Sequence, residues 1–174
     1  GCIVLGTGFI LEPEEAQEWI EQDPRNAEVL FPYLNGRDFN GRPDCSASRW
    51  VIDFLERSEA EASTYHAPWQ HVTDSVRPGR LKKDRLRYPR MVDEWWKFFS
   101  TRPTMRNAIA SLSEVTVIAQ TSATLAPGRV VADQVFDQKL VVFSSGSWSL
   151  FAVLTSSLHL AWALRFGSTI RTDP

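Results

Sequence analysis

The sequence has few of the residue types that build metal sites, disulfide frameworks and membrane spans. It contains two cysteines, two methionines and three histidines in 174 residues. Cys2 and Cys45 have no C-x-x-C spacing and no neighbouring histidine, so neither a zinc site nor a disulfide framework is indicated. No apolar run approaches the ~20 residues of a membrane span, and the apolar start lacks the basic flank of a signal peptide. We therefore expect a soluble protein of a reducing cytoplasm that contacts no membrane.

Motifs for cofactor or metal chemistry are also missing. Gly6–Gly8 begins like a dinucleotide-binding fingerprint, but Phe9 and the apolar residues after it occupy the positions of the third glycine and the helix start. His66 and His71 are five residues apart, which does not place them on one helix face. His159 lies in an apolar run and is interpreted as a core residue. These patterns predict neither a cofactor loop nor a metal cluster in this chain.

Two further catalytic patterns do not fit this sequence. A metal-dependent nuclease places an acid ahead of an acid-x-Lys pair, and Asp44 with Asp137 and Lys139 fits that pattern only across 93 positions (137 − 44). The tetrapeptides Asn-Pro-Pro-Tyr and Asp-Pro-Pro-Tyr, with which amino-methyltransferases hold a flipped base, do not occur. We expect a chain without catalytic activity of its own.

Charge is distributed very unevenly along the chain. Residues 1–62 contain thirteen acidic residues against five arginines, a net charge of −8, whereas residues 77–106 contain ten basic residues against three acids, a net charge of +7. A basic segment of this strength suggests a surface that faces a polyanion, and the alternative is a solvated helix face.

Helices are predicted from apolar periodicity and capping residues. The stretch 13–22 begins with proline in its first turn and repeats apolar residues on one face. Ser58 followed by Glu61 predicts a capping box. The helices expected on these grounds are 13–22, 58–76 with an interruption at Pro68, 90–99 and 101–112.

Runs of β-branched and aromatic residues predict strands at 3–11, 49–54, 115–119, 129–136 and 139–143. Between residues 26 and 48, the Asn-Gly steps at Asn35 and Asn40 predict tight turns. The run 148–166 is apolar almost all round and predicts a buried helix. The fold class is therefore α+β, a single domain of residues 1–174 with a small, mostly antiparallel sheet and several packed helices, including a buried C-terminal helix.

The whole chain resembles one family of DNA-modifying enzymes. The run FILEPEEAQEWIEQDPRNAEVLFPYLNGRDFNGRPDCSASRWVIDF is similar to the segment that follows the methyltransferase domain in MmeI-like (type IIG/IIL) restriction-modification enzymes and related adenine-specific DNA methyltransferases. The likeness continues through SVRPGRLKK, EWWKFF, QVFDQKLVVF and AVLTSSLHLAWALRFGSTIRTD. It covers almost the entire chain, so it is more specific than any single motif.

The resemblance implies a target-recognition domain, which binds duplex DNA and directs an S-adenosylmethionine-dependent adenine-N6 methyltransferase, possibly with a fused endonuclease, to its site. The chain would then be a fragment of a larger bacterial protein. S-adenosylmethionine is expected in the methyltransferase domain of that parent and not in this chain. The expected partners are duplex DNA and that methyltransferase domain.

Candidate DNA contacts follow from side-chain chemistry together with the resemblance. Basic residues that would bind phosphates are Arg77, Arg80, Lys82, Lys83, Arg85 and Arg87. Polar residues that would read bases lie in the segment QTSATLAPGR, where the resembling enzymes vary in specificity: Gln120, Thr121, Ser122, Thr124 and Arg129. Weaker candidates are Asn35, Arg37, Asp38 and Arg49. The alternatives are turn chemistry for the Asn and Asp residues and an ion pair for Arg49.

A second function class stays open. Seven tryptophans and ten phenylalanines are more large aromatics than an average core needs. If Trp95, Trp96, Phe98 and Phe99 form an exposed patch, the domain is a protein-interaction or scaffolding module.

Overall fold

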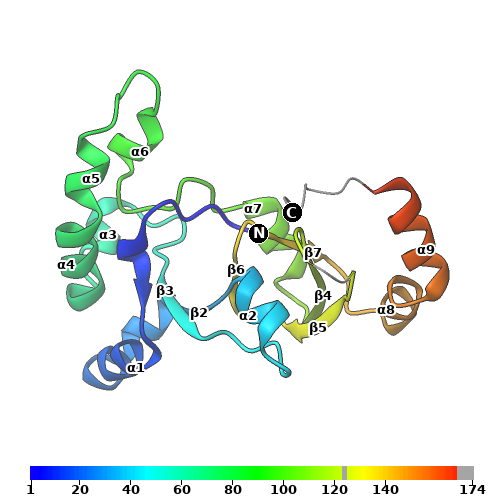
Figure 1. Ribbon diagram of the computed structural model, residues 1–174. Helices are drawn as coiled ribbons and strands as arrows, with labels where there is room; N and C mark the ends of the chain where they lie inside the picture. Colours follow the sequence, from blue (N-terminus) through cyan, green and yellow to red (C-terminus); the bar gives the residue numbers. More distant parts are fainter. Residues whose placement is uncertain (123–124, 168–174) are drawn as a thin grey trace.

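Two small β-sheets form the centre of the computed structural model, which describes residues 1–122 and 125–167 (Figure 1). The larger sheet has the order β1-β3-β2-β6 and the smaller one the order β5-β4-β7. The strands of the larger sheet are β1 Ile10–Leu11, β2 Leu30–Leu34, β3 Arg49–Ile52 and β6 Val135–Phe136. Those of the smaller sheet are β4 Glu114–Ala119, β5 Gly128–Val131 and β7 Leu140–Phe143. The fold class is α+β, as predicted.

Antiparallel pairing dominates both sheets. Strand β3 lies between β1 and β2 with Val51 opposite both Ile10 and Phe31. The pair β2·β6 is parallel, with Leu34 beside Phe136. Strand β2 lies within the stretch that the sequence assigned to turns. The predicted strand at 3–11 is reduced to β1, since residues 7–9 form a 3-10 turn instead.

Helices surround the sheets, and the one predicted at 13–22 is confirmed as α1 Pro13–Gln22. The capping box is also confirmed, because the Ser58 side chain accepts from the Glu61 backbone and the Glu61 side chain accepts from the Ser58 backbone. The Asn35-Gly36 step begins a short helix instead of a tight turn. The remaining helices are α2 Gly36–Gly41, α3 Glu59–Ala62, α4 His66–Ser75, α5 Arg77–Leu81, α6 Pro89–Asp93, α7 Pro103–Ile109, α8 Trp148–Leu154 and α9 Ser157–Phe166.

Each sheet has its own apolar core. Phe9, Val51 and Phe54 are fully buried in the first core, in which Phe54 packs against Trp69 of α4 with ring centroids 5.9 Å apart. Leu34 and Phe136 belong to the second core, which lies against the smaller sheet. Because these two residues sit on the parallel strands of the larger sheet, they join the two halves into one domain.

The aromatic run near residue 95 is part of the first core. Trp95, Trp96 and Phe98 are buried, and Trp69 packs against both tryptophans with ring centroids 4.9 and 6.3 Å away. Phe99 alone is exposed. The prediction of an exposed interaction patch from these four residues is therefore wrong, because the tryptophans are buried in the core against Trp69 of α4.

The C-terminal run 148–166 is neither one helix nor buried. It breaks after Leu154 into α8 and α9, whose axes are bent by 53°. No residue of α9 is buried, and Trp162 is 62% exposed. The two helices follow the smaller sheet at the orange and red end of the chain in Figure 1, and α9 lies farther from the sheets than α8. The prediction of a buried C-terminal helix was wrong. A helix that is apolar on all sides needs another surface to cover it, but its sequence does not show whether that surface belongs to the same chain.

Within the described ranges 1–122 and 125–167, no single helix is long and apolar enough to cross a membrane. The bent pair α8 and α9 meets the length and composition requirements only when its two helices are taken together.

Candidate nucleic-acid interface

Arg80 points inward, although its neighbours in sequence predict a phosphate contact. The residue is 3% exposed, and its Nη2 atom donates to the carbonyl oxygens of Val4 and Leu5, both at 3.0 Å. Its guanidinium also lies over the Phe9 ring, 5.6 Å from the centroid. Burial lowers the pKa of Arg80 to about 10, so the group stays charged at neutral pH. It fastens α5 to the start of the chain and is corrected to a structural residue.

Two more basic residues of the same segment form ion pairs within the fold and are not available at the surface. Arg106 forms an ion pair with Asp53, which is 1% exposed. Burial raises the pKa of Asp53, and the Arg106 charge opposes that shift. Lys97 is buried too and donates to Glu94 at 2.8 Å. The net charge of +7 counted along the segment therefore overstates the charge at the surface.

Four of the remaining basic residues lie on an exposed connection between α5 and α6. We call residues 81–88 the basic projection, and Figure 1 shows this region extending from the helical end of the molecule. Its basic side chains, all exposed, are Lys82, Lys83, Arg85 and Arg87. Arg85 pairs with Asp93 at 2.8 Å, and Arg87 lies over the Tyr88 ring. Arg77, at the start of α5, is exposed as well and lies over Trp95, 5.1 Å from the centroid.

A second polar surface forms where β4 ends. The backbone N–H of Gln120 donates to the Lys139 carbonyl at 2.8 Å, and its side-chain Nε2 donates to the Gln138 carbonyl at 2.9 Å. Asn40, on α2, donates to the Thr121 carbonyl at 3.3 Å. These bonds bring the β4–β5 connection, the β6–β7 turn and α2 together, although they are far apart in sequence.

We call this second surface the loop face. All its members are exposed, and they are Arg37, Asn40, Gln120, Thr121 and Lys139. A glycine lets α2 pack closely behind it, because a Cβ at Gly128 would lie 2.8 Å from the Phe39 ring. The face therefore rests on a tightly packed base.

Arg129 does not join the loop face. Its Nη2 atom pairs with Glu114 at 2.7 Å and its Nη1 atom donates to the Gly146 carbonyl at 2.9 Å. The guanidinium stacks on Trp148, 4.0 Å from the ring centroid. Arg129 therefore holds α8 to the smaller sheet, and its expected role in reading bases is corrected. Ser122 is exposed beside Thr121, while Thr124 lies outside the described residues.

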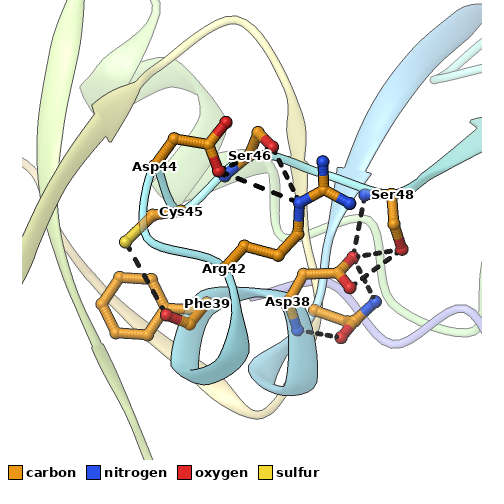
Figure 2. A network of polar contacts seen from close by, with 8 residues as sticks. Asp38, Phe39, Arg42, Asp44, Cys45, Ser46 and Ser48 are labelled. Carbon is orange, nitrogen blue, oxygen red and sulfur yellow. Dashed lines mark hydrogen bonds and ion pairs between the residues drawn. The ribbon is translucent and has the colours of Figure 1, made fainter.

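Asn35 and Asp38 are occupied by their own loop. Asn35 caps α2 by accepting from the backbone N–H groups of Arg37 and Asp38, each at 2.9 Å. Asp38 in turn accepts from the backbone and hydroxyl of Ser48, as Figure 2 shows. Arg49 pairs with Glu12. The alternative of turn chemistry is thus confirmed for Asn35 and Asp38, whose expected DNA contacts are corrected. The alternative of an ion pair is confirmed for Arg49, and its DNA contact stays a prediction because its side chain is 43% exposed.

Two loop-face residues were not predicted as DNA contacts. Asn40 was assigned to a turn, and Lys139 was considered only as part of a nuclease pattern. Both reach the face through contacts between distant segments: Asn40 bonds residue 121, and Lys139 precedes the edge strand β7. The β6–β7 turn also exposes Gln138. Only pairing information across the chain would have found them.

Neither surface suggests a metal centre, and the described part of the chain contains no group of three or more His, Cys, Asp or Glu side chains that could hold a metal ion. A groove of about 750 Å³ does lie between α8 and α9. It is lined by Ala152, Val153, Ser156, Leu158, His159 and Trp162. This groove is apolar and distinct from both polar surfaces.

Comparison with known proteins gives consistent results. Residues 3–174 match the family described as "MmeI, target recognition domain". A solved structure, that of the type IIL restriction-modification enzyme MmeI in complex with DNA, is similar with a TM-score of 0.74 and 18% sequence identity. The similarity covers 98% of this chain but 22% of that one. No curated protein sequence matches the chain.

Proposed function

The chain belongs to the MmeI target recognition domain family, and from that membership we propose that it recognises a specific sequence in duplex DNA. The loop face reads bases, and the basic projection binds phosphates. The observation that carries this proposal is the convergence of exposed Asn40 and Gln120 with Arg37 and Lys139 from three separate segments. Side chains of these types make the paired hydrogen bonds that distinguish base pairs in the major groove.

The chemistry of the loop face supports this assignment. The amide of Asn or Gln can bond adenine through one donor and one acceptor, and Arg or Lys can donate to guanine. Gln120 uses one N–H on the Gln138 carbonyl, which orients its amide and leaves a second N–H and a carbonyl oxygen for a base edge. A side chain held in one orientation loses less entropy on binding.

The basic projection supplies the contacts that do not depend on sequence. Lys82 and Lys83 are exposed and have no acidic partner among the described residues. Lysines of this kind neutralise phosphates and release counterions, so they strengthen binding to any duplex and make it sensitive to salt.

A selection experiment tests the reading role. The chain is used to enrich a library of randomised duplexes, and the preferred sequence is compared between the wild type and Gln120→Ala. We expect the variant to lose about 1–3 kcal/mol of discrimination at one base pair, with other positions unchanged. Gln70→Ala is the matched control, since Gln70 is an exposed glutamine on α4 that bonds only Asp74. An unchanged preference in Gln120→Ala would count against the loop face.

We also infer what the parent protein does. The chain spans only about a fifth of the MmeI chain that it resembles, so the activity of the parent is a proposal of its own. The family and the sequence resemblance support a bacterial parent that methylates adenine at N6 with S-adenosylmethionine, with or without a fused endonuclease. The recognition domain would be non-catalytic and would deliver that activity to one site.

The methyltransferase part of the same polypeptide is the partner proposed for the apolar groove between α8 and α9. Leu158 and Trp162 line that groove and are 82% and 62% exposed. Contiguous apolar exposure of this kind marks a surface that another protein covers. Because the matched chain is several times longer than this domain, a neighbouring part of one polypeptide is the occupant that the comparison favours.

Mutation of the groove tests this docking. Leu158→Ser combined with Trp162→Ser should abolish co-purification with the methyltransferase part when the two parts are expressed as separate chains, because burial of both side chains is lost. DNA binding by the recognition domain itself should not change. Val131→Ser, at an exposed residue of β5, is the control and should retain the partner. Retention by the double variant would remove the groove from the interface.

A further inference from the structure

Leu86 is the most exposed large apolar side chain among the described residues. It is 96% exposed and lies in the basic projection, away from both apolar cores. Single exposed leucines are common at protein surfaces. This one differs because it stands between Arg85 and Arg87, in a connection where nearly every neighbour is charged.

The turn that carries Leu86 is held by hydrogen bonds to Asp84. The Oδ1 atom of Asp84 accepts from the backbone N–H groups of Leu86 at 2.9 Å and Arg87 at 3.4 Å. The carbonyl oxygen of Asp84 accepts from Tyr88 at 2.8 Å. The only acid in the projection is thus used to fix the turn, and the leucine is presented outward in a defined position.

The arginines on either side are braced in the same way. Arg85 reaches Asp93 on α6 at 2.8 Å, and Arg87 lies 5.3 Å from the centroid of the Tyr88 ring. Lys82 and Lys83 stand earlier in the same connection without an acid. The projection therefore combines an apolar tip at Leu86 with cations on both sides of it; its other exposed leucine, Leu81, lies at the end of α5 and is 52% exposed.

Duplex DNA has the complementary arrangement. Its phosphates line the edges of each groove, and the apolar faces of stacked bases lie between them. Proteins that bend DNA insert leucine, phenylalanine or similar side chains between base steps while basic residues hold the flanking phosphates. An acidic protein pocket would need to match both features, and nothing in the described residues favours one.

We propose that Leu86 is an apolar wedge that enters a DNA groove and partly unstacks one base step, with Lys82, Lys83 and Arg87 on the phosphates beside it. This inference rests on the proposed function and adds a contact that deforms the duplex. The projection is then more than a phosphate clamp, because the wedge favours sequences whose steps open easily. Pyrimidine-purine steps are the most easily kinked.

The test uses duplexes of the preferred sequence that carry 2-aminopurine at successive positions, since this base fluoresces more strongly when it is unstacked. Binding of the wild-type chain should raise the fluorescence at one step. Leu86→Ala should abolish that rise and weaken binding roughly tenfold, because the buried apolar area is lost. The salt dependence should stay the same, since no cation is removed.

Two matched variants make the outcome specific. Leu86→Phe should retain the fluorescence rise, because a ring also fits between base pairs. Leu164→Ala removes a leucine that is 71% exposed on α9 and lies outside the groove lining; this variant should bind DNA and raise the fluorescence as the wild type does. Circular dichroism of Leu86→Ala should match the wild type, since the residue contributes nothing to either core.

The outcomes separate the wedge from the function on which it rests. Wild-type binding without a fluorescence rise at any step, or a rise that persists in Leu86→Ala, overturns the wedge and leaves DNA recognition intact. Failure of the wild-type chain to bind any duplex overturns both. Leu86-dependent binding to vesicles of acidic phospholipid, with DNA binding unaffected by Leu86→Ala, assigns the tip to a membrane surface instead and also overturns the wedge.

Discussion

The segment 77–106 contains two groups of basic residues that are alike in sequence and opposite in structure. Arg80, Lys97 and Arg106 point inward: Arg80 bonds backbone carbonyl groups, Lys97 pairs with the half-buried Glu94, and Arg106 pairs with the buried Asp53. Lys82 and Lys83, adjacent to the first of these along the chain, are exposed in the basic projection. A single stretch of positive charge thus fastens the fold with one set of residues and offers an electrostatic surface with the other.

The difference teaches that charge density along a chain is a poor measure of the field at its surface. An inward-facing arginine stabilises the fold and contributes little to binding, because its charge is neutralised or enclosed. An outward-facing lysine contributes little to stability and acts through long-range attraction. Mutations in the two groups should therefore separate into stability effects and binding effects.

The largest effect is expected at Arg106. Arg106→Met leaves the carboxylate of Asp53 buried without its partner, which should lower the free energy of unfolding by about 3–5 kcal/mol. Chemical denaturation measures this change. Adding Asp53→Asn to Arg106→Met should recover part of the loss, because the unpaired charge is removed. A stability equal to that of the wild type would show that Arg106 belongs with the outward group.

Arg80→Met should have the next largest effect. It leaves the carbonyl oxygens of Val4 and Leu5 without the donor that they share, at a cost of about 1–3 kcal/mol in unfolding free energy. Arg77→Met, on the same helix but exposed, is the control and should change stability far less. If Arg80→Met instead reduced DNA affinity without reducing stability, the distinction between the two groups would fail at this position.

The outward group is tested by Lys82→Gln combined with Lys83→Gln. Two lost phosphate contacts should reduce the slope of log affinity against log salt by about 2. The loss of affinity relative to the wild type should therefore become about tenfold smaller between 50 and 200 mM salt. Stability should not change, because neither side chain has a partner among the residues that the structure describes. Arg25→Gln removes an exposed cation that pairs with Asp23 on another surface and should keep the wild-type slope.

Local sequence signals predicted the elements whose cause is local. Helix α1 is specified by Pro13 and an apolar stripe, and α3 by the Ser58–Glu61 box. Strand β4 follows from its β-branched residues. Strand β2 was missed because Pro32 and the nearby Asn-Gly steps indicate turns, whereas pairing with β3 and β6 on its two sides makes it a strand.

The candidate site depended more on contacts between distant segments. Gln120 and Thr121 were predicted from their hydrogen-bonding side chains and from the family resemblance of the segment QTSATLAPGR, and both are exposed. The sequence could not show that Arg129 would pair with Glu114 or that Arg80 would reach the carbonyl of Val4, since those partners are 15 and 76 positions away. Whether a side chain points inward or outward is determined by tertiary packing.

The smallest effect is expected at Arg90, which combines features of both groups. Its side chain is exposed like those of the outward group, but it pairs with Glu94 at 2.9 Å in an i,i+4 arrangement on the surface. Arg90→Gln should change unfolding free energy by only about 0.3–0.5 kcal/mol. It should also leave the salt slope of DNA binding nearly unchanged, because Glu94 already neutralises the charge. Denaturation and salt titration of this variant distinguish two requirements for a phosphate contact: exposure of the cation alone, or exposure without an acidic partner. If the slope of log affinity against log salt falls as much as it does on loss of one projection lysine, exposure alone is sufficient.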